Sequence, residues 1–495
     1  MAEAGTLTGA EHTVRVGRSN ARRSWRGRRV ALVVLLIAVV AGCNGWPSYR
    51  GDPGQTGFNS TESVLNTTNV STLALRATGR AGGYIVGAPV VVDDLVYVTT
   101  LSKTLEAFDA NLTTGCASRL ECPPLWRAEL PTDTSAAATV SGGFVYVVTP
   151  DRGSSNGRLL AFKAGNGADC TAVVGQVTRI CSPVWQAAAS SEYGPPTVAN
   201  GVVYVAHNGT LPGTAPSTLT PPALLAFDAA GSTNCGGAPR TCAPIWTAPS
   251  NAIMSPAVAG GRAYTVNVST GVVSAFDAAG STGCTGTPKV CTPLFTSAAA
   301  PNNDPSVNVV VVDGTAFRAQ TGTVTAFDAD GAESCGGSPV VCQPLWTAAN
   351  GGGQMNLIAV AYGDVYVSAG SQVWVYDAAG VASCGGAPKT CSPRRKVSWD
   401  PGISQSEMPW ATSSLIIANG VGYVAIGNGT GFPALLAFDA RSMNGCTADA
   451  IPICPLLAKH QVDSDVDVAM TPAVQGGRAY VGTTDGHLYL LELPS

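Results

Sequence analysis

A block of about twenty residues recurs along this 495-residue chain and strongly limits what the chain can fold into. It reads FDAAGSTNCGGAPRTCAPIW at 227–246, FDAAGSTGCTGTPKVCTPLF at 276–295 and FDADGAESCGGSPVVCQPLW at 327–346. Its opening motif, centred on Ala-Phe-Asp-Ala, occurs in related forms at 107–110, 161–164, 226–229, 275–278, 326–329, 375–378 and 437–440, with a truncated copy at 488–492. A period of about 50 to 65 residues indicates a repeat architecture with one supersecondary unit per copy.

Each unit is predicted to contain four short strands. An apolar run such as GAPVVVD (87–93) leads through a turn into a second run such as LVYVTT (95–100). The Ala-Phe-Asp motif supplies the third strand, and the Pro-aliphatic-aromatic ending, as in Ile245-Trp246, supplies the fourth. With no helical period after the first 42 residues, this pattern predicts an all-β, eight-bladed β-propeller of four-stranded antiparallel blades. The fourth-strand aromatics are expected to pack between blades as core.

The number of copies predicts how the ring closes. Eight third strands occur, but only seven cysteine loops with a fourth strand after them, because the sequence ends shortly after the eighth third strand. The segment STLALRATG at 71–79 precedes the first full unit and aligns with the fourth strands of the others. We therefore expect the last blade to be closed by this N-terminal strand, with the propeller spanning 71–495.

Apart from Cys43, the cysteines form an even set with local spacing, most often C-x6-C with glycine and proline inside. In an exported chain this predicts structural disulfides rather than a metal site, because zinc ligands favour C-x2-C or histidine-containing spacings. The expected pairs are Cys116 with Cys122, Cys170 with Cys181, Cys235 with Cys242, Cys284 with Cys291, Cys335 with Cys342, Cys384 with Cys391, and Cys446 with Cys454.

The first 42 residues have the pattern of a secretory signal. An arginine-rich stretch precedes the apolar run VALVVLLIAVVAG at 30–42, which is shorter than the ~20 residues of a membrane span. The run ends in Val40-Ala41-Gly42-Cys43, which resembles a bacterial lipobox whose cysteine carries the lipid. We expect residues 1–42 to be a lipoprotein signal peptide, 43–70 a lipidated N-terminal arm, and the protein to be anchored on the extracytoplasmic side of a bacterial membrane. The choice of Sec or Tat export and of membrane stays open.

Charge excludes one class of partner. Removing residues 1–42 takes seven arginines and two acids from a chain of formal net charge −4 and leaves −9. No cluster of lysine and arginine remains in the mature part, and binding of nucleic acid would require one.

The repeat resembles the pyrroloquinoline quinone (PQQ)-like β-propeller family, whose unit runs Gly-x-Val-Tyr-Val, then Gly-x-Leu-x-Ala-Phe-Asp-Ala, then Leu-Trp. In this chain the matching residues are GVVYVA at 201–206, ALLAFDA at 223–229 and Pro244-Ile245-Trp246, and the opening WPSYRGDPGQTGFNSTES at 46–63 resembles a segment that often begins such lipoproteins. The family includes both dehydrogenases and non-catalytic scaffolds, so the resemblance predicts the fold and not the function.

The resemblance also implies what a dehydrogenase of this family would contain. Quinoprotein alcohol dehydrogenases have a vicinal Cys-Cys disulfide under the quinone and a calcium ion held by Glu, Asn and Asp. This sequence contains no Cys-Cys dipeptide, and no calcium set can be assigned. We expect no resident cofactor or metal and assign no catalytic residue, while PQQ with calcium, in an enzyme that oxidises an alcohol or sugar, is the alternative.

Ligand binding is expected on the face away from the cysteine loops, where the loops from strand two to three and from strand four to the next blade gather. Eight residues are candidates on this face: Tyr193, His207, Arg318, Gln354, Glu407, Trp410, Asp463 and Asp465. They are a mixed polar set, suited to a small polar molecule, a glycan or a peptide loop. The sequence therefore predicts a monomeric, non-catalytic binding or scaffolding module whose partner stays unknown.

Overall fold

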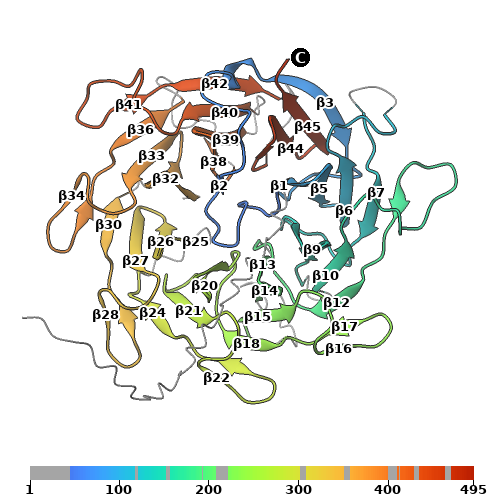
Figure 1. The fold of residues 1–495 in the computed structure, drawn as a ribbon, viewed down its shortest axis with the longest axis horizontal. Coiled ribbons are helices and arrows are strands. Elements are labelled where there is room, and N and C mark those ends of the chain that lie inside the picture. The colour runs from blue at the N-terminus through green and yellow to red at the C-terminus, as the bar shows by residue number, and fades with distance from the viewer. Residues whose placement is uncertain are drawn as a thin grey trace, which may run out of the picture. The chain divides into compact units, whose positions relative to one another are not determined.

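The computed structural model describes residues 45–116, 121–151, 157–191, 193–207, 221–300, 308–349, 357–399, 410–411, 413–427, 434–462 and 470–494. Eight β-sheets follow one another around a ring (Figure 1), so the predicted eight-bladed propeller is confirmed. The described part contains a single short 3-10 helix, η1 (Val70–Thr72), and no helix that is both long and apolar enough to span a membrane.

Each blade contains four strands, which are named below in order from the ring axis outward. The first four blades contain β4 (Val90–Val92), β5 (Leu95–Thr100), β6 (Thr104–Asp109) and β7 (Trp126–Glu129); β8 (Thr139–Ser141), β9 (Phe144–Val148), β10 (Arg158–Lys163) and β12 (Trp185–Ala188); β13 (Thr197–Ala199), β14 (Val202–His207), β15 (Ala223–Asp228) and β18 (Trp246–Pro249); and β19 (Ala257–Ala259), β20 (Arg262–Val266), β21 (Val273–Asp277) and β24 (Phe295–Ser297).

The other four blades follow the same order. They contain β25 (Asn308–Val312), β26 (Thr315–Gln320), β27 (Thr323–Asp328) and β30 (Trp346–Ala349); β31 (Ile358–Ala361), β32 (Asp364–Ala369), β33 (Gln372–Asp377) and β36 (Arg395–Ser398); β38 (Ile416–Ala418), β39 (Val421–Gly427), β40 (Ala434–Asp439) and β42 (Leu456–Gln461); and β43 (Ala473–Gln475), β44 (Arg478–Gly482), β45 (His487–Glu492) and β3 (Ala74–Arg80).

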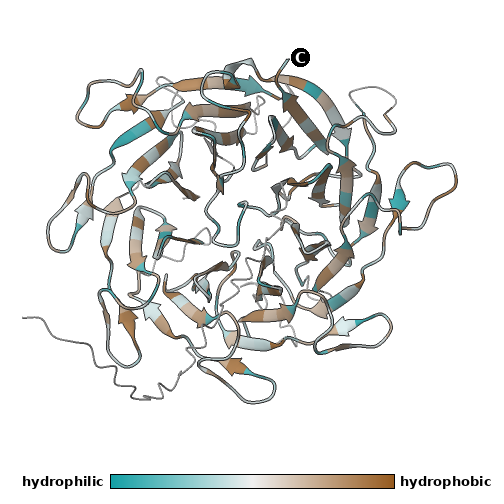
Figure 2. Cartoon of the chain, in the orientation of Figure 1, coloured by the Kyte–Doolittle hydropathy of each residue, from teal (hydrophilic) through white to brown (hydrophobic). Residues whose placement is uncertain are grey.

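Both faces of a blade are buried against its neighbours, which explains the nearly continuous apolar strands (Figure 2). In β14, Val203 and Val205 pack in the core shared with blade 2, while the intervening Tyr204 packs in the core shared with blade 4. Alternating side chains therefore serve two interfaces rather than one core and one solvent face.

A repeated hydrogen-bond pattern joins neighbouring blades. The hydroxyl of Tyr204 and the indole Nε1 of Trp246, both in blade 3, donate to the carbonyl oxygen of Ala278 in blade 4 at 2.9 and 3.2 Å. Tyr146 and Trp185 of blade 2 donate in the same way to Ala229, at 2.9 and 3.2 Å. The fourth-strand aromatics are thus buried between blades as predicted, and at these two interfaces the alanine after Phe-Asp is the acceptor that the tyrosine and the tryptophan share.

The aspartate of the third-strand motif organises the turn that follows. The Asp228 carboxylate accepts hydrogen bonds from the backbone N–H groups of Ser232 and Thr233 at 2.9 and 2.7 Å. Within this turn, Gly231 has a φ of +62° and packs so closely on Trp185 that an added Cβ would lie 2.3 Å from the indole. The recurring order of the block, Phe-Asp-Ala-x-Gly, therefore encodes a turn that leaves room for the aromatic residue of the preceding blade.

The cysteine loops form seven local disulfides, with the pairs that the spacing predicted. The structure adds a feature that the sequence analysis missed: these loops lie beside the outer strand of the preceding blade. For example, β17 (Thr241–Cys242) pairs in parallel with β12, and β23 (Val290–Cys291) pairs in parallel with β18. Each hairpin covers a sheet edge that would otherwise expose unpaired backbone groups.

The N-terminal strand closes the ring as predicted, with its start moved slightly along the chain. β3 pairs antiparallel with β45, from Ala74 opposite Glu492 to Arg80 opposite His487. Blades 1 to 6 and blade 8 each receive the cysteine loop of the next blade on their outer strand. In the described part of the chain, β42 of blade 7 receives none, because blade 8 is built from the two ends of the propeller and has no such loop.

Residues 45–59, which we call the axial arm, cross the centre of the ring (Figure 1). Strand β1 (Gly45–Trp46) pairs with β4 of blade 1, and β2 (Phe58–Asn59) pairs in parallel with β38 of blade 7. Between them, arm carbonyls accept hydrogen bonds from inner-strand N–H groups of Val140, Val258, Val311, Val360 and Ile417. Side-chain bonds from Gln55 to Thr197 and from Asn59 to Val474 reach the two remaining blades.

Candidate functional site

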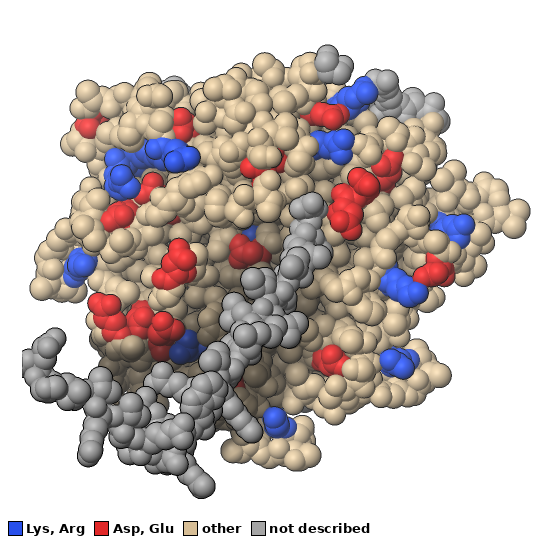
Figure 3. All heavy atoms as spheres, in the orientation of Figure 1, with Lys and Arg blue, Asp and Glu red and all other residues tan. Residues whose placement is uncertain are grey.

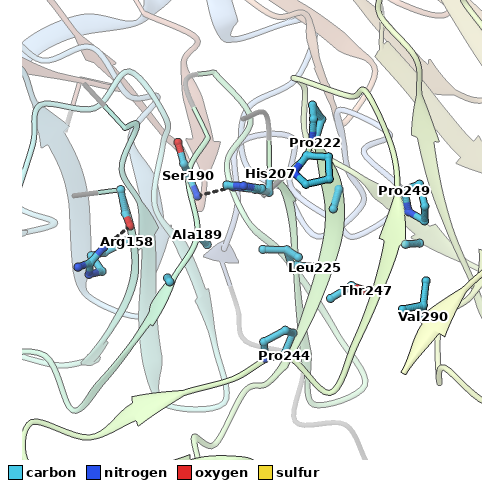
Figure 4. A pocket seen from close by; sticks show the side chains of 15 residues that line it. Arg158, Ala189, Ser190, His207, Pro222, Leu225, Pro244, Thr247, Pro249 and Val290 are labelled. Atoms are coloured by element: carbon cyan, nitrogen blue, oxygen red, sulfur yellow. Dashed lines mark hydrogen bonds between the residues drawn. The ribbon is translucent and has the colours of Figure 1, made fainter. Parts of the chain in front are cut away.

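A cavity of about 500 Å³ lies between blades 2 and 3 (Figure 4). Its walls come from the end of β12, the end of β14, the start of β15 and the outer strand β18. The ends of β12 and β14 and the start of β15 lie on the face away from the cysteine loops, whereas Val290, which also lines the cavity, belongs to a cysteine hairpin. Four of the lining residues are prolines, Pro221, Pro222, Pro244 and Pro249, and most others are alanine, leucine or valine.

Two residues of the cavity wall occupy positions that hold larger side chains in blade 6. Leu225, two residues before Phe227, lies opposite Thr247 in the β15–β18 register. In blade 6 the corresponding pair is Trp374 opposite Lys396, with the ammonium nitrogen 3.7 Å from the centre of the indole ring. Leucine and threonine cannot fill the volume of a tryptophan with a lysine over it, so blade 3 has space where blade 6 has side chains.

One titratable ring contacts the polar end of this cavity. His207, at the end of β14, is only 3% exposed, and its Nδ1 accepts a hydrogen bond from the backbone N–H of Ser190 at 3.1 Å. This assigns the proton of the neutral imidazole to Nε2. The Ser190 hydroxyl accepts instead from the backbone N–H of Asp151 at 2.8 Å. Ser190 therefore orients His207 through its main chain and is not arranged as a nucleophile beside a base.

A basic group stands at the cavity wall without pointing its charge at the histidine. Arg158, which begins β10, donates from Nη1 to the carbonyl oxygen of Gly157 at 2.8 Å. Figure 4 shows its guanidinium turned away from His207 and toward blade 2. The arrangement offers an apolar chamber with a few hydrogen-bonding groups at one end, which is the composition of a small-molecule binding site.

Of the three predicted face residues whose side chains the structure describes, only one lines this cavity. His207 lines it, whereas Tyr193 is 45% exposed in the loop between β12 and β13. The backbone of Trp410 lies in β37 (Trp410–Ala411), which pairs with β39. Gln354, Glu407, Asp463 and Asp465, the side chain of Trp410 and the lipidation residue Cys43 lie outside the described residues, so their roles stay predictions.

Arg318 is buried between blades 4 and 5 instead of facing solvent as a ligand residue would. It is 2% exposed and donates to the carbonyl oxygens of Gly271 and Ala298, the latter at 3.1 Å. Its guanidinium carbon also lies 4.9 Å from the centre of the Phe327 ring. Burial lowers the pKa of this arginine to about 10. Its contacts identify it as a link between two blades.

The resemblance implies metal ligands and a Cys-Cys pair for a quinoprotein dehydrogenase. The described residues contain no group of three or more His, Cys, Asp or Glu side chains placed to hold a metal ion. The described cysteines form local disulfides. Inner strands at the ring axis donate hydrogen bonds to carbonyl oxygens of the axial arm. No ligand set for PQQ with calcium is assigned among the described residues, and no catalytic step is assigned to that group.

Charged groups are sparse on the surface. On the face seen in Figure 3, lysine and arginine side chains lie scattered among acidic ones, and most of the described surface drawn there is uncharged. This face therefore lacks, among the described residues drawn there, the broad basic area that phosphate backbones require.

Comparison with known proteins supports the fold. Residues 68–283 match a family model, PQQ_2, described as outer membrane protein assembly factor BamB. BamB from Moraxella catarrhalis is similar in structure, with 12% identity, a TM-score of 0.52, and coverage of 85% of this chain and 98% of that chain. No curated protein matches the sequence.

Dehydrogenases have the same fold. A quinohemoprotein alcohol dehydrogenase from Comamonas testosteroni is 13% identical with a TM-score of 0.55, covering 91% of this chain and 80% of that chain. A europium-containing methanol dehydrogenase is also 13% identical with a TM-score of 0.55, covering 91% and 98%. Likenesses at such identity show architecture and not activity. The repeated motif, the eight-bladed ring and the match over residues 68–283, which is less than half of the chain, support the resemblance to the PQQ-like β-propeller family.

Proposed function

We propose that this protein is an extracytoplasmic binding module without its own catalysis, anchored through a lipid on Cys43. The cavity between blades 2 and 3 carries the proposal. It holds about 500 Å³, within the range of small-molecule sites, and is lined mainly by proline, alanine and leucine. The seven disulfides and the lipobox-like Val40-Ala41-Gly42-Cys43 support a location outside the cytoplasm.

The ligand that suits this cavity has an apolar ring or chain and one hydrogen-bonding group. The proline and leucine walls would contact the apolar part, while the edge formed by Ser190 and His207 would meet the polar end. An indole or phenol has this composition, as does the side chain of a tryptophan or tyrosine in a partner protein. The same module could thereby hold a small molecule or a protein loop.

The test is to fill the cavity by a change that the fold already tolerates elsewhere. Leu225→Trp copies the residue that blade 6 has at the corresponding position, Trp374. Crystals or NMR samples of the mature chain would be exposed to indole, phenol and N-acetylglucosamine as probes. We expect at least one probe to occupy the wild-type cavity and to be lost from Leu225→Trp. Leu225→Met, which nearly conserves volume, is the matched control and should keep binding.

Failure of all probes to enter the wild-type cavity would contradict the assignment of this cavity as the binding site. A thermal melt of each variant is needed beside the binding data, because loss of fold would also abolish binding. Wild-type-like melting of Leu225→Trp with unchanged probe binding would likewise refute it, since the tryptophan would then not fill the proposed site.

The dehydrogenase alternative is favoured by the quinoprotein enzymes among the structural neighbours. It is tested by titrating the mature chain with PQQ and calcium, followed by absorbance and by dye-coupled oxidation of alcohols and sugars. We expect neither saturable binding nor turnover. Saturable binding with turnover would replace the binding-module proposal with an enzyme.

A further inference from the structure

The axial arm carries a buried arginine, Arg50. Arg50 is 3% exposed. Its Nε donates to the carbonyl oxygen of Gln55 at 2.8 Å, and its own carbonyl oxygen accepts from the backbone N–H of Gly57 at 3.0 Å. The side chain is therefore held in place by the arm that it belongs to.

The two terminal nitrogens of this guanidinium have no hydrogen-bond partner among the described residues. Nη1 and Nη2 of Arg50 are both buried, and neither makes a hydrogen bond to any described residue. Burial lowers the pKa of Arg50, which expresses how poorly its surroundings solvate the positive charge. A buried cation without a partner is costly, and the cost falls when an anion or water satisfies it.

The nearest acidic residue along the chain is committed elsewhere. Asp52 accepts hydrogen bonds from the hydroxyl and the backbone N–H of Thr56, the latter at 3.3 Å. Burial raises the pKa of Asp52, although those hydrogen bonds and the charge of Arg50 oppose the rise. The described residues contain no ion pair between Asp52 and Arg50, so this carboxylate does not neutralise the guanidinium at close range.

A small cavity adjoins the arginine. It measures about 10 Å³, the space of a single water molecule or an ion of similar size, and is lined by Arg50, Gln55, Ser255 and Asn308 among others. Ser255 immediately precedes blade 4 and Asn308 begins blade 5, so the cavity lies where the chain enters these blades. The hydroxyl of Ser255 and the side-chain oxygen of Gln55 are also buried without a partner among the described residues.

We propose that this cavity binds one small anion, of the size of chloride, between the guanidinium of Arg50 and the hydroxyl of Ser255. Both groups are hydrogen-bond donors, and the guanidinium supplies the charge that distinguishes an anion from water. The space excludes larger oxyanions. The anion would neutralise a charge within the element that contacts all eight blades, and binding to the folded state alone would stabilise the ring.

Bromide is the direct probe because it replaces chloride and scatters X-rays anomalously. Crystals of the mature protein would be grown or soaked in bromide and measured at its absorption edge. We expect an anomalous peak beside Nη1 or Nη2 of Arg50 and Oγ of Ser255. Density in the cavity without anomalous signal would show water there and overturn the proposal.

Stability in solution gives a second, independent readout. Urea denaturation of the wild-type protein would be compared in sodium chloride and in sodium gluconate at equal ionic strength, since gluconate is too large for the cavity. We expect a higher midpoint in chloride for the wild type and a smaller difference for Arg50→Gln and Ser255→Ala. The serine variant keeps the test usable if Arg50→Gln does not fold.

Arg240→Gln is the control for charge, because Arg240 is an exposed arginine on a cysteine hairpin and its loss changes the net charge equally. It should keep the full difference between chloride and gluconate. An equal midpoint of the wild type in both salts would contradict the proposal, as would an equal loss of the difference in Arg240→Gln.

Discussion

Two regions of this propeller are held together in opposite ways: the axis, where the axial arm lies, and the rim, by which we mean the repeated contacts between blades outside the inner strands, including the cysteine hairpins. At the rim, one arrangement is repeated: a tyrosine hydroxyl of one blade donates to a carbonyl of the next at five of the interfaces in the described chain. At the axis, the fifteen residues of the axial arm occur once and bond to all eight blades. Repeated contacts make stability a sum of local terms, whereas a single shared element makes the blades depend on one another.

Loss of the axial arm should therefore have the largest effect. Replacing residues 47–57 by a flexible glycine-serine linker of equal length would leave the inner-strand N–H groups of five blades without their arm carbonyls. Unsatisfied buried groups cost about 1–3 kcal/mol each, partly recovered where water enters, so we expect a loss on the order of 5 kcal/mol. Urea denaturation should show the whole ring unfolding earlier in one transition.

The matched change at the rim is to replace residues 285–290, inside one cysteine hairpin, by glycine and serine. We expect a smaller loss there, because that hairpin covers only the outer strand of blade 3. Equal losses from the two replacements would break the comparison between axis and rim and would show that the arm adds no coupling.

Opening one disulfide should have an intermediate and local effect. Closing a loop of about eight residues stabilises a protein by about 2.5 kcal/mol in the chain-entropy account, and native strain reduces this value. Replacing Cys284 and Cys291 together by serine should cost at most that amount and should raise hydrogen exchange chiefly in the hairpin and in β18, which it covers. Exchange that rises equally in the distant blade 7 would contradict a local role for the rim.

Repeated features of the fold could be predicted from the sequence, whereas features that occur once could not. The number of blades and the disulfide pairs could be derived because the blade motif and the cysteine spacing recur along the sequence. The closing strand could be derived because the last copy of the repeat lacks a fourth strand. The outward position of the cysteine hairpins could not, since the two-residue strands at Thr241–Cys242 and Val290–Cys291 have no periodicity of their own. The path of the axial arm was equally hidden, because a segment that occurs once offers no internal comparison.

The site was less predictable than the fold. His207 could be placed on the correct face from its position after a second strand, but its orientation depends on the backbone N–H of Ser190, which follows the outer strand of the preceding blade. Leu225 and Thr247 of the cavity wall correspond to the larger Trp374 and Lys396 of blade 6, a correspondence that becomes visible only when the strand registers are aligned. Arg318 was predicted to be a surface ligand residue because the sequence around it does not reveal that the carbonyl oxygens of Gly271 and Ala298, from the preceding blade, accept its hydrogen bonds.

A single hydroxyl group offers a finer test of the rim. Tyr204 donates to Ala278 at 2.9 Å, whereas the buried hydroxyl of Tyr423 in blade 7 has no partner among the described residues. Tyr204→Phe should cost about 1 kcal/mol, the usual value of a buried hydrogen bond. Tyr423→Phe should be neutral or stabilising, because it removes a buried polar group that is unsatisfied. Equal effects in urea denaturation would show that the shared carbonyl contributes nothing to joining blades.

The smallest effect expected is the pH dependence of the turns that the third-strand aspartates organise. Partial burial alone would raise the pKa of Asp228, but hydrogen bonds from the Ser232 hydroxyl and from nearby backbone N–H groups outweigh it and lower the pKa to about 2. A carboxylate whose pKa is depressed in the folded state contributes stability that is present above about pH 4 and is lost as the pH falls toward 2.

Asp228→Asn should therefore destabilise the protein slightly at neutral pH. It should also flatten the acid limb, which is the loss of stability of the protein between pH 4 and 2. Asp328→Asn tests the same position in blade 5, where the carboxylate accepts from the backbone N–H of Glu333 at 2.8 Å but from no serine or threonine hydroxyl among the described residues. An acid limb that is steeper in Asp228→Asn than in the wild type would show that this turn is not held by the charged carboxylate, and the repeated rim would then owe its turns to glycine alone.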